Sequence, residues 1–226
     1  MPSVTRPDLL VLDVNETLSD LSALGERFVT VGAPAGLVAP WFAGVLRDGF
    51  ALAVLGGSAP FADVAADGLR TVLAGHDLDR PLDEAVATVL AGFAELPVHP
   101  DAAAGLPRLA AAGIRMVAMS NGATAVAEQL LTNAGLRGHV EAVLSVEEAG
   151  AWKPDARAYA FALRRSQVAQ HAATMVACHP WDLLGADAAG LGTVWIDRTG
   201  APWPTSFPEP DHRVGGFDEL ADLYGA

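Results

Sequence analysis

The sequence contains a single cysteine, Cys178, among its 226 residues. One thiol cannot form an internal disulfide, and no other cysteine or histidine stands at a zinc-ligand spacing from it. The sequence therefore predicts no zinc site. We interpret Cys178 as a small, buried apolar residue.

Lysine is equally scarce. The chain has one, Lys153, against 13 arginines, and its formal net charge is −13. Because clustered basic residues are missing, the chain is unsuited to bind nucleic acid or an anionic membrane surface, and we expect a small anionic molecule as its substrate. A lysine that persists where arginine is the rule indicates a position that needs an ammonium group.

Long apolar runs are also missing. We find no run of the roughly 20 residues that span a bilayer, and the first residues lack the basic segment and apolar stretch of a secretory signal. We therefore expect a cytoplasmic protein without a membrane segment. Hydrophobic residues make up 51% of the chain and charged residues 18%, which is typical of a chain that folds by itself around a packed core.

The first apolar run, residues 9–12, ends at Asp13. Short apolar runs of this kind are typical of buried strands in a parallel sheet, which present functional residues at their carboxyl ends. From residue 18 to 93 the pattern changes to alanine- and leucine-rich stretches such as 41–54 and 82–93. These stretches predict an all-helical insert.

After the prolines at 97 and 100, helix and strand patterns alternate in the order typical of βαβ units. The expected elements are helix 102–112, strand 114–119, helix 125–134, strand 142–145, helix 156–165, strand 174–178, helix 183–189 and strand 193–196. Residues 201–210 are expected to form a loop before a short terminal helix.

Together these patterns predict an α/β fold. A Rossmann-like parallel-sheet core would comprise residues 1–16 and 96–226, and an all-helical cap would comprise residues 17–95, inserted after the first strand. Ligands of such sheets bind at the carboxyl ends of the strands. The functional residues are therefore expected there.

Polar residues follow four of the predicted strands. They are Asp13 with Asn15 and Thr17, Ser120 with Asn121, Lys153, and His179 with Asp182. In order and spacing these residues resemble the four motifs of the haloacid dehalogenase superfamily, over nearly the whole chain. The matching segments are 13–18 (Asp-Val-Asn-Glu-Thr-Leu), 120–122 (Ser-Asn-Gly), 153–155 (Lys-Pro-Asp) and 179–186 (His-Pro-Trp-Asp followed by Gly-Ala). The resemblance implies that Asp13 is a nucleophile and that the helical insert is a cap.

Within this superfamily, the residue two positions after the nucleophile helps to separate phosphatases from dehalogenases. Phosphatases usually have an aspartate there as general acid, whereas this chain has Asn15, whose amide exchanges no proton at neutral pH. They also usually have an acidic metal ligand four residues before Asp182, where this chain has Cys178. A halide needs no proton on leaving, so the sequence favours carbon–halogen hydrolysis without a metal ion.

Two further segments resemble the 2-haloacid dehalogenases in particular, namely 153–159 (Lys-Pro-Asp-Ala-Arg-Ala-Tyr) and 181–186 (Trp-Asp-Leu-Leu-Gly-Ala). The resemblance implies that Asp13 attacks the halogen-bearing carbon of a short 2-haloalkanoate and that water cleaves the resulting ester. We expect no cofactor, and because such caps often join two copies, a homodimer is a candidate assembly. The candidate residues are catalytic Asp13, Thr17, Lys153, Asp182 and His179, and substrate-binding Asn15, Ser120, Asn121, Arg47, Trp41, Phe42, Tyr159 and Trp181.

Three positions depart from the dehalogenase pattern. The aromatic residue expected two after the nucleophile is Asn15, and the asparagine of the fourth motif is His179. His179 is either a water-activating base or a structural histidine. The cap arginine expected just after a tryptophan, where it would receive the halide, is Phe42. Arg47 on the same predicted helix is the expected substitute.

Two other functions stay open. A Mg²⁺-dependent phosphatase of the same superfamily would form an aspartyl phosphate on Asp13 and use Asp182 as a metal ligand. A non-catalytic binding or regulatory protein would have kept the fold and lost halide chemistry through Phe42. The presence of Asp13, Lys153 and Asp182 together argues against that loss.

Overall fold

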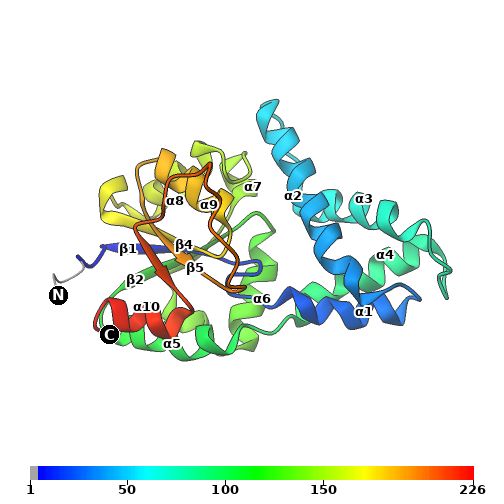
Figure 1. Ribbon diagram of the computed structural model, residues 1–226, viewed down its shortest axis with the longest axis horizontal. Helices are drawn as coiled ribbons and strands as arrows, with labels where there is room; N and C mark the ends of the chain where they lie inside the picture. The colour runs from blue at the N-terminus through cyan, green and yellow to red at the C-terminus, as the bar shows by residue number, and fades with distance from the viewer. Residues whose placement is uncertain (1–4) are drawn as a thin grey trace.

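The computed structural model describes residues 5–226, which form a six-stranded parallel sheet and a group of helices to one side of it (Figure 1). The strand order is β3-β2-β1-β4-β5-β6, and every neighbouring pair is parallel. This confirms the predicted α/β fold with a Rossmann-like sheet. The strands are β1 Leu9–Asp13, β2 Arg115–Ser120, β3 Ala142–Ser145, β4 Ala173–Ala177, β5 Gly192–Ile196 and β6 His212–Val214.

Helices cover both faces of the sheet. Successive side chains of a strand point to opposite faces, and here both faces carry apolar side chains that the helices bury. Along β1, Leu10 belongs to the apolar cluster that contains Leu106, whereas Leu9 belongs to the cluster that contains Leu183. The helices of the core are α5 Pro100–Ala111, α6 Thr124–Asn133, α7 Val146–Ala149, α8 Ala156–Ser166, α9 Pro180–Ala188 and α10 Phe217–Leu223.

The remaining helices form what we call the cap, at the right of Figure 1. They are α1 Leu24–Thr30, α2 Val38–Val54, α3 Phe61–Leu73 and α4 Leu82–Ala91, with the 3₁₀ turns η1 Leu21–Ala23, η2 Ala35–Leu37 and η3 Gly92–Glu95. In α3, Phe61 and Leu69 lie on one buried face at helical spacing. Trp41 of α2 packs with Phe28 and Phe93, with ring centroids 5.8 and 6.0 Å apart, so the cap has an aromatic centre of its own.

Two chain segments join the cap to the core, and they lie side by side. The amide of Asp20 donates to the carbonyl of Pro97 at 2.9 Å, and the amide of His99 donates to the carbonyl of Leu18 at 2.8 Å. The pairing fixes where the chain leaves the sheet and where it returns. The cap is thereby held next to the carboxyl end of β1.

Arg198, which follows β5, fastens these two segments to the core. Its guanidinium group donates to the carbonyl oxygen of Thr17 and to the carboxylate of Asp101, both at 2.6 Å. The second oxygen of Asp101 accepts a hydrogen bond from the amide of Phe217 at 2.9 Å. One arginine therefore ties the loop after β1 to the beginning of α5.

Two expectations from the sequence need correction. β6 was not predicted, because three residues are too few to show a strand pattern. The stretch Ala35–Val54 is long and apolar enough, by length and composition, to cross a membrane, so the expectation that no run reaches this length is wrong. Its two charged residues, Arg47 and Asp48, lower the mean hydropathy of the stretch too little to exclude it from this class. A third of its most apolar window is buried inside the protein, and core helices of soluble proteins pass the same test.

Candidate active site

Asp13 is the last residue of β1, at the sheet edge where open α/β sheets bind their ligands. Its carboxylate is buried, and Oδ2 accepts a hydrogen bond from Oγ1 of Thr17 at 2.6 Å. Oγ1 of Thr17 in turn accepts from the amide of Cys178 at 3.0 Å. Thr17 therefore ties the nucleophile candidate to the end of β4, as its place in the first motif predicts.

The other oxygen of Asp13 faces Lys153. Nζ of Lys153 donates to Oδ1 of Asp13 and to Oδ2 of Asp182, both at 2.7 Å, and to the carbonyl of Met119 at 3.1 Å. The side chains of Lys153 and Asp182 are fully buried. The fold thus brings together Asp13, Lys153 and Asp182 from three separate motifs, and each ammonium hydrogen has an acceptor.

The charges of this group fix its protonation. Burial by itself would raise the pKa of the Asp13 carboxyl group, but Lys153 and then His179 outweigh burial and lower that pKa well below its usual range. Burial would lower the pKa of Lys153, but the two carboxylates raise it. The pKa of Asp182 is raised by burial, which Lys153 only partly opposes. Asp13 is therefore ionised at neutral pH, as a carboxylate nucleophile must be.

Two residues predicted to bind substrate also hold this charged group in place. Oδ1 of Asn121 accepts a hydrogen bond from the amide of Lys153 at 2.9 Å, and the hydroxyl of Tyr159 donates to Oδ1 of Asp182 at 2.6 Å. Burial, and then Asp182, raise the pKa of Tyr159 well above its usual value, so the hydroxyl stays a donor. That Asn121 and Tyr159 also contact substrate stays a prediction.

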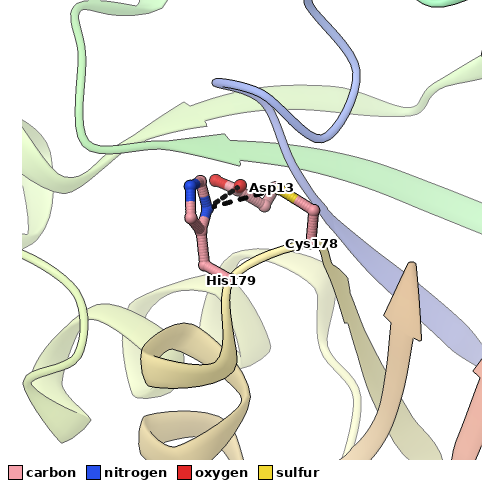
Figure 2. A group of neighbouring side chains, drawn as sticks. All are labelled: Asp13, Cys178 and His179. Carbon is pink, nitrogen blue, oxygen red and sulfur yellow. Dashed lines mark hydrogen bonds and ion pairs between the residues drawn. The ribbon is translucent and has the colours of Figure 1, made fainter. Parts of the chain in front are cut away.

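His179, the residue before α9, connects Asp13 to Glu16. Its Nδ1 lies 3.2 Å from Oδ2 of Asp13 (Figure 2), and its Nε2 lies 2.8 Å from Oε2 of Glu16. Burial would lower the pKa of His179, but Cys178, Asp13 and Glu16 raise it well above its usual value. A protonated imidazole can donate to both carboxylates and cannot accept a proton from water. This favours a hydrogen-bonding role for His179 over that of a water-activating base.

A cavity of about 100 Å³ lies between the cap and the core, lined by Val14 and Asn15, which directly follow Asp13 in the sequence. Asn15 and Ser120 give it polar atoms, and Phe61 and Phe93 of the cap give it an apolar wall. Oγ of Ser120 accepts from the amide of Gly122 at 2.9 Å, which leaves its hydroxyl hydrogen for a ligand. Sites for drug-sized ligands measure roughly 300–1,000 Å³, so this cavity fits a much smaller molecule.

A second, open hollow lies on the other side of His179. Phe42 and Trp181, both predicted to bind substrate, line it together with Phe50 and Glu16. The ring of Trp181 packs against those of Phe50 and His179, with centroids 4.8 and 5.1 Å apart. Phe42 and Trp181 therefore lie beside His179 and do not border the cavity at Ser120.

The structure does not bring Arg47 to Asp13. The side chain of Arg47 is 75% exposed, and its guanidinium group pairs with the adjacent Asp48 at 2.8 Å. Five residues along a helix turn the direction of a side chain by roughly 140°, so Arg47 cannot share the inward direction of Phe42. This corrects the expectation that Arg47 replaces the missing cap arginine. It reaches only the rim of the open hollow.

Trp41 also lies away from the site. Its ring is buried inside the cap, and its Nε1 donates to the carbonyl of Ala65 at 3.0 Å. Sequence reasoning, in contrast, overlooked Glu16. This residue has a φ of 59°, in the left-handed region that non-glycine residues seldom adopt, and this conformation is visible only in the structure. Its place inside the first motif was the only signal in the sequence.

Among the described residues 5–226, three potential metal ligands converge on one point. They are a carboxylate oxygen of Asp13, Sγ of Cys178 and Nδ1 of His179, all within 4.8 Å of one another (Figure 2). The expectation that Cys178 has no ligating neighbours is therefore wrong, and so is its interpretation as a buried apolar residue, because it is only partly buried. Mg²⁺ prefers six oxygen ligands, and here two of three donors are sulfur and nitrogen while Lys153 holds Oδ1 of Asp13. The Mg²⁺ ion of the phosphatase alternative does not fit this set.

A family model for haloacid dehalogenase-like hydrolases matches residues 7–190, a range that contains Asp13, Lys153 and Asp182. The chain belongs to this family. The resemblance found in the sequence motifs is thereby confirmed. The family match covers β1 through β4, the cap and α9, and so includes every residue placed at the site above.

Known relatives are similar over different lengths. (S)-2-haloacid dehalogenase 1 of Pseudomonas sp. (strain CBS-3) is 34% identical over 135 residues, which are 60% of this chain and 60% of that relative. An (S)-2-haloacid dehalogenase of Pseudomonas fluorescens is 26% identical over 216 residues, 94% of each chain. Among solved structures, a dehalogenase with an intermediate complex superposes with a TM-score of 0.91 at 28% identity, over 99% of both chains.

Proposed function

We propose that this protein hydrolyses a short 2-haloalkanoic acid to a 2-hydroxy acid, through an ester on Asp13 and without a metal ion. The observation that carries the proposal is the buried, ionised carboxylate of Asp13, held against Nζ of Lys153 at the edge of the sheet. The dehalogenase from Pseudomonas fluorescens, similar over 94% of this chain, supports the same chemistry.

The reaction has two steps. An oxygen of Asp13 attacks the carbon that bears the halogen, and the carbon–halogen bond breaks with its electron pair on the leaving halide. The attack inverts that carbon. Water then attacks the carbonyl carbon of the Asp13 ester, and the bond from that carbon to the substrate oxygen breaks. One proton of the water goes to the product hydroxyl group, the other goes to solvent, and Asp13 is again a carboxylate.

The residues around Asp13 have distinct parts in this proposal. Lys153 holds Asp13 ionised and in place, and Ser120, Asn121 and Asn15 bind the substrate carboxylate with hydroxyl and amide donors. Phe61 and the other apolar wall residues contact the short alkyl chain. Arg47 points away from the site, so it does not supply a cation beside Asp13. The protonated His179 lies beside Asp13, and its ring centroid is 6.4 Å from that of Phe42, the residue at the position of the expected cap arginine. We assign to His179 the balance of charge on the leaving halide.

The phosphatase alternative is less well supported. A phosphoryl group carries two negative charges, and phosphatases balance them with carboxylates around Mg²⁺. Here Asp13 and Asp182 both bind Lys153, and the neighbouring donors are Cys178 and His179. The single ammonium group is already shared by two carboxylates and cannot balance a dianionic phosphoryl group, whereas a haloacid brings only one negative charge.

An isotope experiment tests the aspartyl ester. In a single turnover of 2-chloropropionate in ¹⁸O-water, with protein in excess, the label is expected in the carboxylate of Asp13 and not in the first product. Mass spectrometry of the peptide containing Asp13 measures it. Asp13→Asn is the matched control, which is expected to release no halide and take up no label. Label that appears only in the product would mean direct attack by water and would contradict the mechanism.

The assembly, location and domain division remain part of this proposal. The core would comprise residues 1–16 and 96–226 and the cap residues 17–95, in a cytoplasmic homodimer that is joined through the cap. Val54 and Leu55, at the end of α2, are 85% and 86% exposed, which supports an apolar contact there. Light scattering of the wild type against a Leu55→Arg variant tests it. A wild type that is monomeric at micromolar concentration would contradict the homodimer.

A further inference from the structure

The cluster of Asp13, Cys178 and His179 has a property that dehalogenation does not use. Each of these residues offers one ligand atom, and Figure 2 shows the three side chains directed to a common point. We propose that they form a binding site for Zn²⁺ or a similar thiophilic divalent ion, and that an ion bound there stops the enzyme by capturing its nucleophile. The site is inhibitory, and the reaction itself needs no ion.

Two of the three ligand separations are close to those of a tetrahedral zinc ion, and all three ligand atoms lie within 4.8 Å of one another. With Zn–S of about 2.3 Å and Zn–N and Zn–O of about 2.0–2.1 Å, tetrahedral angles place nitrogen and oxygen about 3.4 Å apart and sulfur and nitrogen about 3.6 Å apart. In the structure, Nδ1 of His179 lies 3.2 Å from Oδ2 of Asp13 and 3.7 Å from Sγ of Cys178. The imidazole nitrogen is therefore within a few tenths of an ångström of its required distance from both other ligands, and rotation of the Cys178 thiol can adjust the remaining sulfur–oxygen separation.

The rigid elements around the cluster favour binding. Asp13 ends β1 and Cys178 directly follows β4, and these two strands pair in register in the centre of the sheet. Oγ1 of Thr17 accepts a hydrogen bond from the amide of Cys178, which fixes the backbone from which the thiol projects. The ligands are thus already in place, and little conformational freedom is lost when the ion binds.

Glu16 completes the arrangement. Its carboxylate lies 2.8 Å from Nε2 of His179 and can accept the hydrogen of that nitrogen, which leaves Nδ1 free to ligate. A carboxylate that orients a metal-binding histidine through its second nitrogen recurs in zinc proteins and raises metal affinity. Glu16, Cys178 and His179 also line an open cleft, together with Asp20, His99 and Arg198, so an ion can enter from solvent and keep a water molecule as fourth ligand.

The donor set selects the ion. Thiolate and imidazole ligands favour Zn²⁺ and disfavour Mg²⁺, which prefers oxygen ligands. Binding displaces two protons to solvent, one from the Cys178 thiol and one from Nδ1 of His179, and no group is oxidised or reduced. Oδ1 of Asp13 keeps its contact with Lys153, while the ion takes the Oδ2 lone pairs. The inhibition rests on the proposed function, since it requires Asp13 to be the nucleophile, whereas the binding does not.

Calorimetric titration of metal-free protein with Zn²⁺ tests the binding without any substrate. One ion per chain is expected. Cys178→Ala and His179→Asn should each weaken binding at least ~100-fold, and Glu16→Gln about 10-fold, because even an orienting carboxylate contributes 10–100-fold. His171→Asn, at an exposed histidine outside the cluster, is the matched control and should bind as the wild type does. Circular dichroism of each variant checks that it is folded. Wild-type binding no tighter than that of folded Cys178→Ala would refute the site.

Halide release with and without Zn²⁺ tests the consequence, each variant being compared with its own metal-free rate. Saturating Zn²⁺ should reduce the rate of halide release by the wild type at least ~100-fold, and Mg²⁺ at the same concentration should leave that rate unchanged. The Cys178→Ala rate should keep most of its metal-free value at the same Zn²⁺ concentration. Equal inhibition of wild type and Cys178→Ala would overturn the inference. Absence of halide release in metal-free wild type would instead contradict the proposed dehalogenation, and the calorimetry would still decide the binding site.

Discussion

Gly49 of α2 lies so close to the indole of Trp152 that a Cβ atom on residue 49 would come within 2.2 Å of the ring. Trp152 directly precedes Lys153, and its own Nε1 donates to the carbonyl of Ala59 at 2.9 Å. Its ring is fully buried and stacks on Phe61, with centroids 5.9 Å apart. The cap and the segment that carries Lys153 therefore meet through a contact that leaves no room for any side chain at residue 49.

Gly49→Ala is expected to separate the cap from the core. Because the ring of Trp152 is fully buried and its Nε1 is hydrogen-bonded, the added methyl group should destabilise the fold by about 1–3 kcal/mol, the usual range for overpacking. It should also lower kcat, since any movement of Trp152 displaces Lys153. Gly44→Ala on the same helix is the matched control: a Cβ there meets nothing within 4 Å, and alanine should stabilise the helix by up to about 1 kcal/mol. Urea denaturation measures the free energy of unfolding, and an equal change of that free energy in both variants would contradict the close contact between residue 49 and Trp152.

Lys153→Met should remove most of the activity and much of the stability. The substitution leaves Asp13 and Asp182 buried without their common cation, and breaking such a pair typically costs about 3–5 kcal/mol. We expect kcat to fall ~100- to 1,000-fold. Lys153→Arg keeps the charge, and should recover stability more than activity because a planar guanidinium cannot reproduce the ammonium contacts. Arg157→Met, at an exposed pair with Asp155, is the control and should change both quantities little.

Arg47→Ala should leave halide release nearly unchanged, within about twofold in kcat/KM. Its guanidinium group is mostly exposed and pairs with Asp48, and exposed pairs contribute roughly 0–1 kcal/mol. Arg70→Ala, at another exposed pair in the cap, gives the reference for a neutral change. A loss of tenfold or more for Arg47→Ala alone would show that the residue swings into the site with substrate bound.

A chelator should leave dehalogenation intact. Lys153 supplies the cation that balances Asp13, and the donors beside it are unsuited to Mg²⁺. Halide and phosphate release are to be measured side by side after EDTA treatment, with 2-chloropropionate and with a panel of small phosphate esters. Halide release that disappears in EDTA and returns with Mg²⁺ would sink the metal-free mechanism. Phosphate release that behaves in this way would favour the phosphatase alternative.

Asp101 should make the stability depend on pH. Burial by itself would raise the pKa of Asp101, but Arg198 and the amide of Phe217 outweigh it and lower that pKa. A lowered folded-state pKa stabilises the fold above the unfolded value of about 3.9, and this stabilisation is lost as pH falls through the folded-state pKa. The Asp101→Asn variant should therefore unfold at a lower urea concentration than the wild type at pH 7, and it should lose less stability than the wild type when the pH is lowered. Asp77→Asn, at an exposed position, is the control, and identical pH profiles for the two would contradict the expectation.

The centre of the site could be predicted from the sequence because strand ends are visible in the pattern. Asp13 closes an apolar run, and Lys153 and Asp182 follow other predicted strands. Since parallel strands end at one edge of a sheet, their side chains had to meet there. The same reasoning identified the α/β fold and the helical insert. β6 escaped it, because three residues carry no readable alternation.

The direction of individual side chains could not be predicted in this way. Tyr159 and Asn121 stand in the expected segments, yet their polar groups turn toward Asp182 and Lys153, because packing decides which neighbour a side chain meets. Arg47 shares a helix with Phe42 but not its face. The cluster of Cys178 and His179 with Asp13 could not be predicted from a motif spacing, because Asp13 lies far from the other two in the sequence.

Burial of Lys153 also determines how the folded protein responds to reagents that react with amines. The sequence has one lysine, and its amine is fully enclosed and bound to two carboxylates. Acylating dyes and amine cross-linkers should thus leave Lys153 unmodified in the native protein and modify it in the unfolded chain. The rate at which Lys153 becomes acylated would then measure how often the interior opens to solvent.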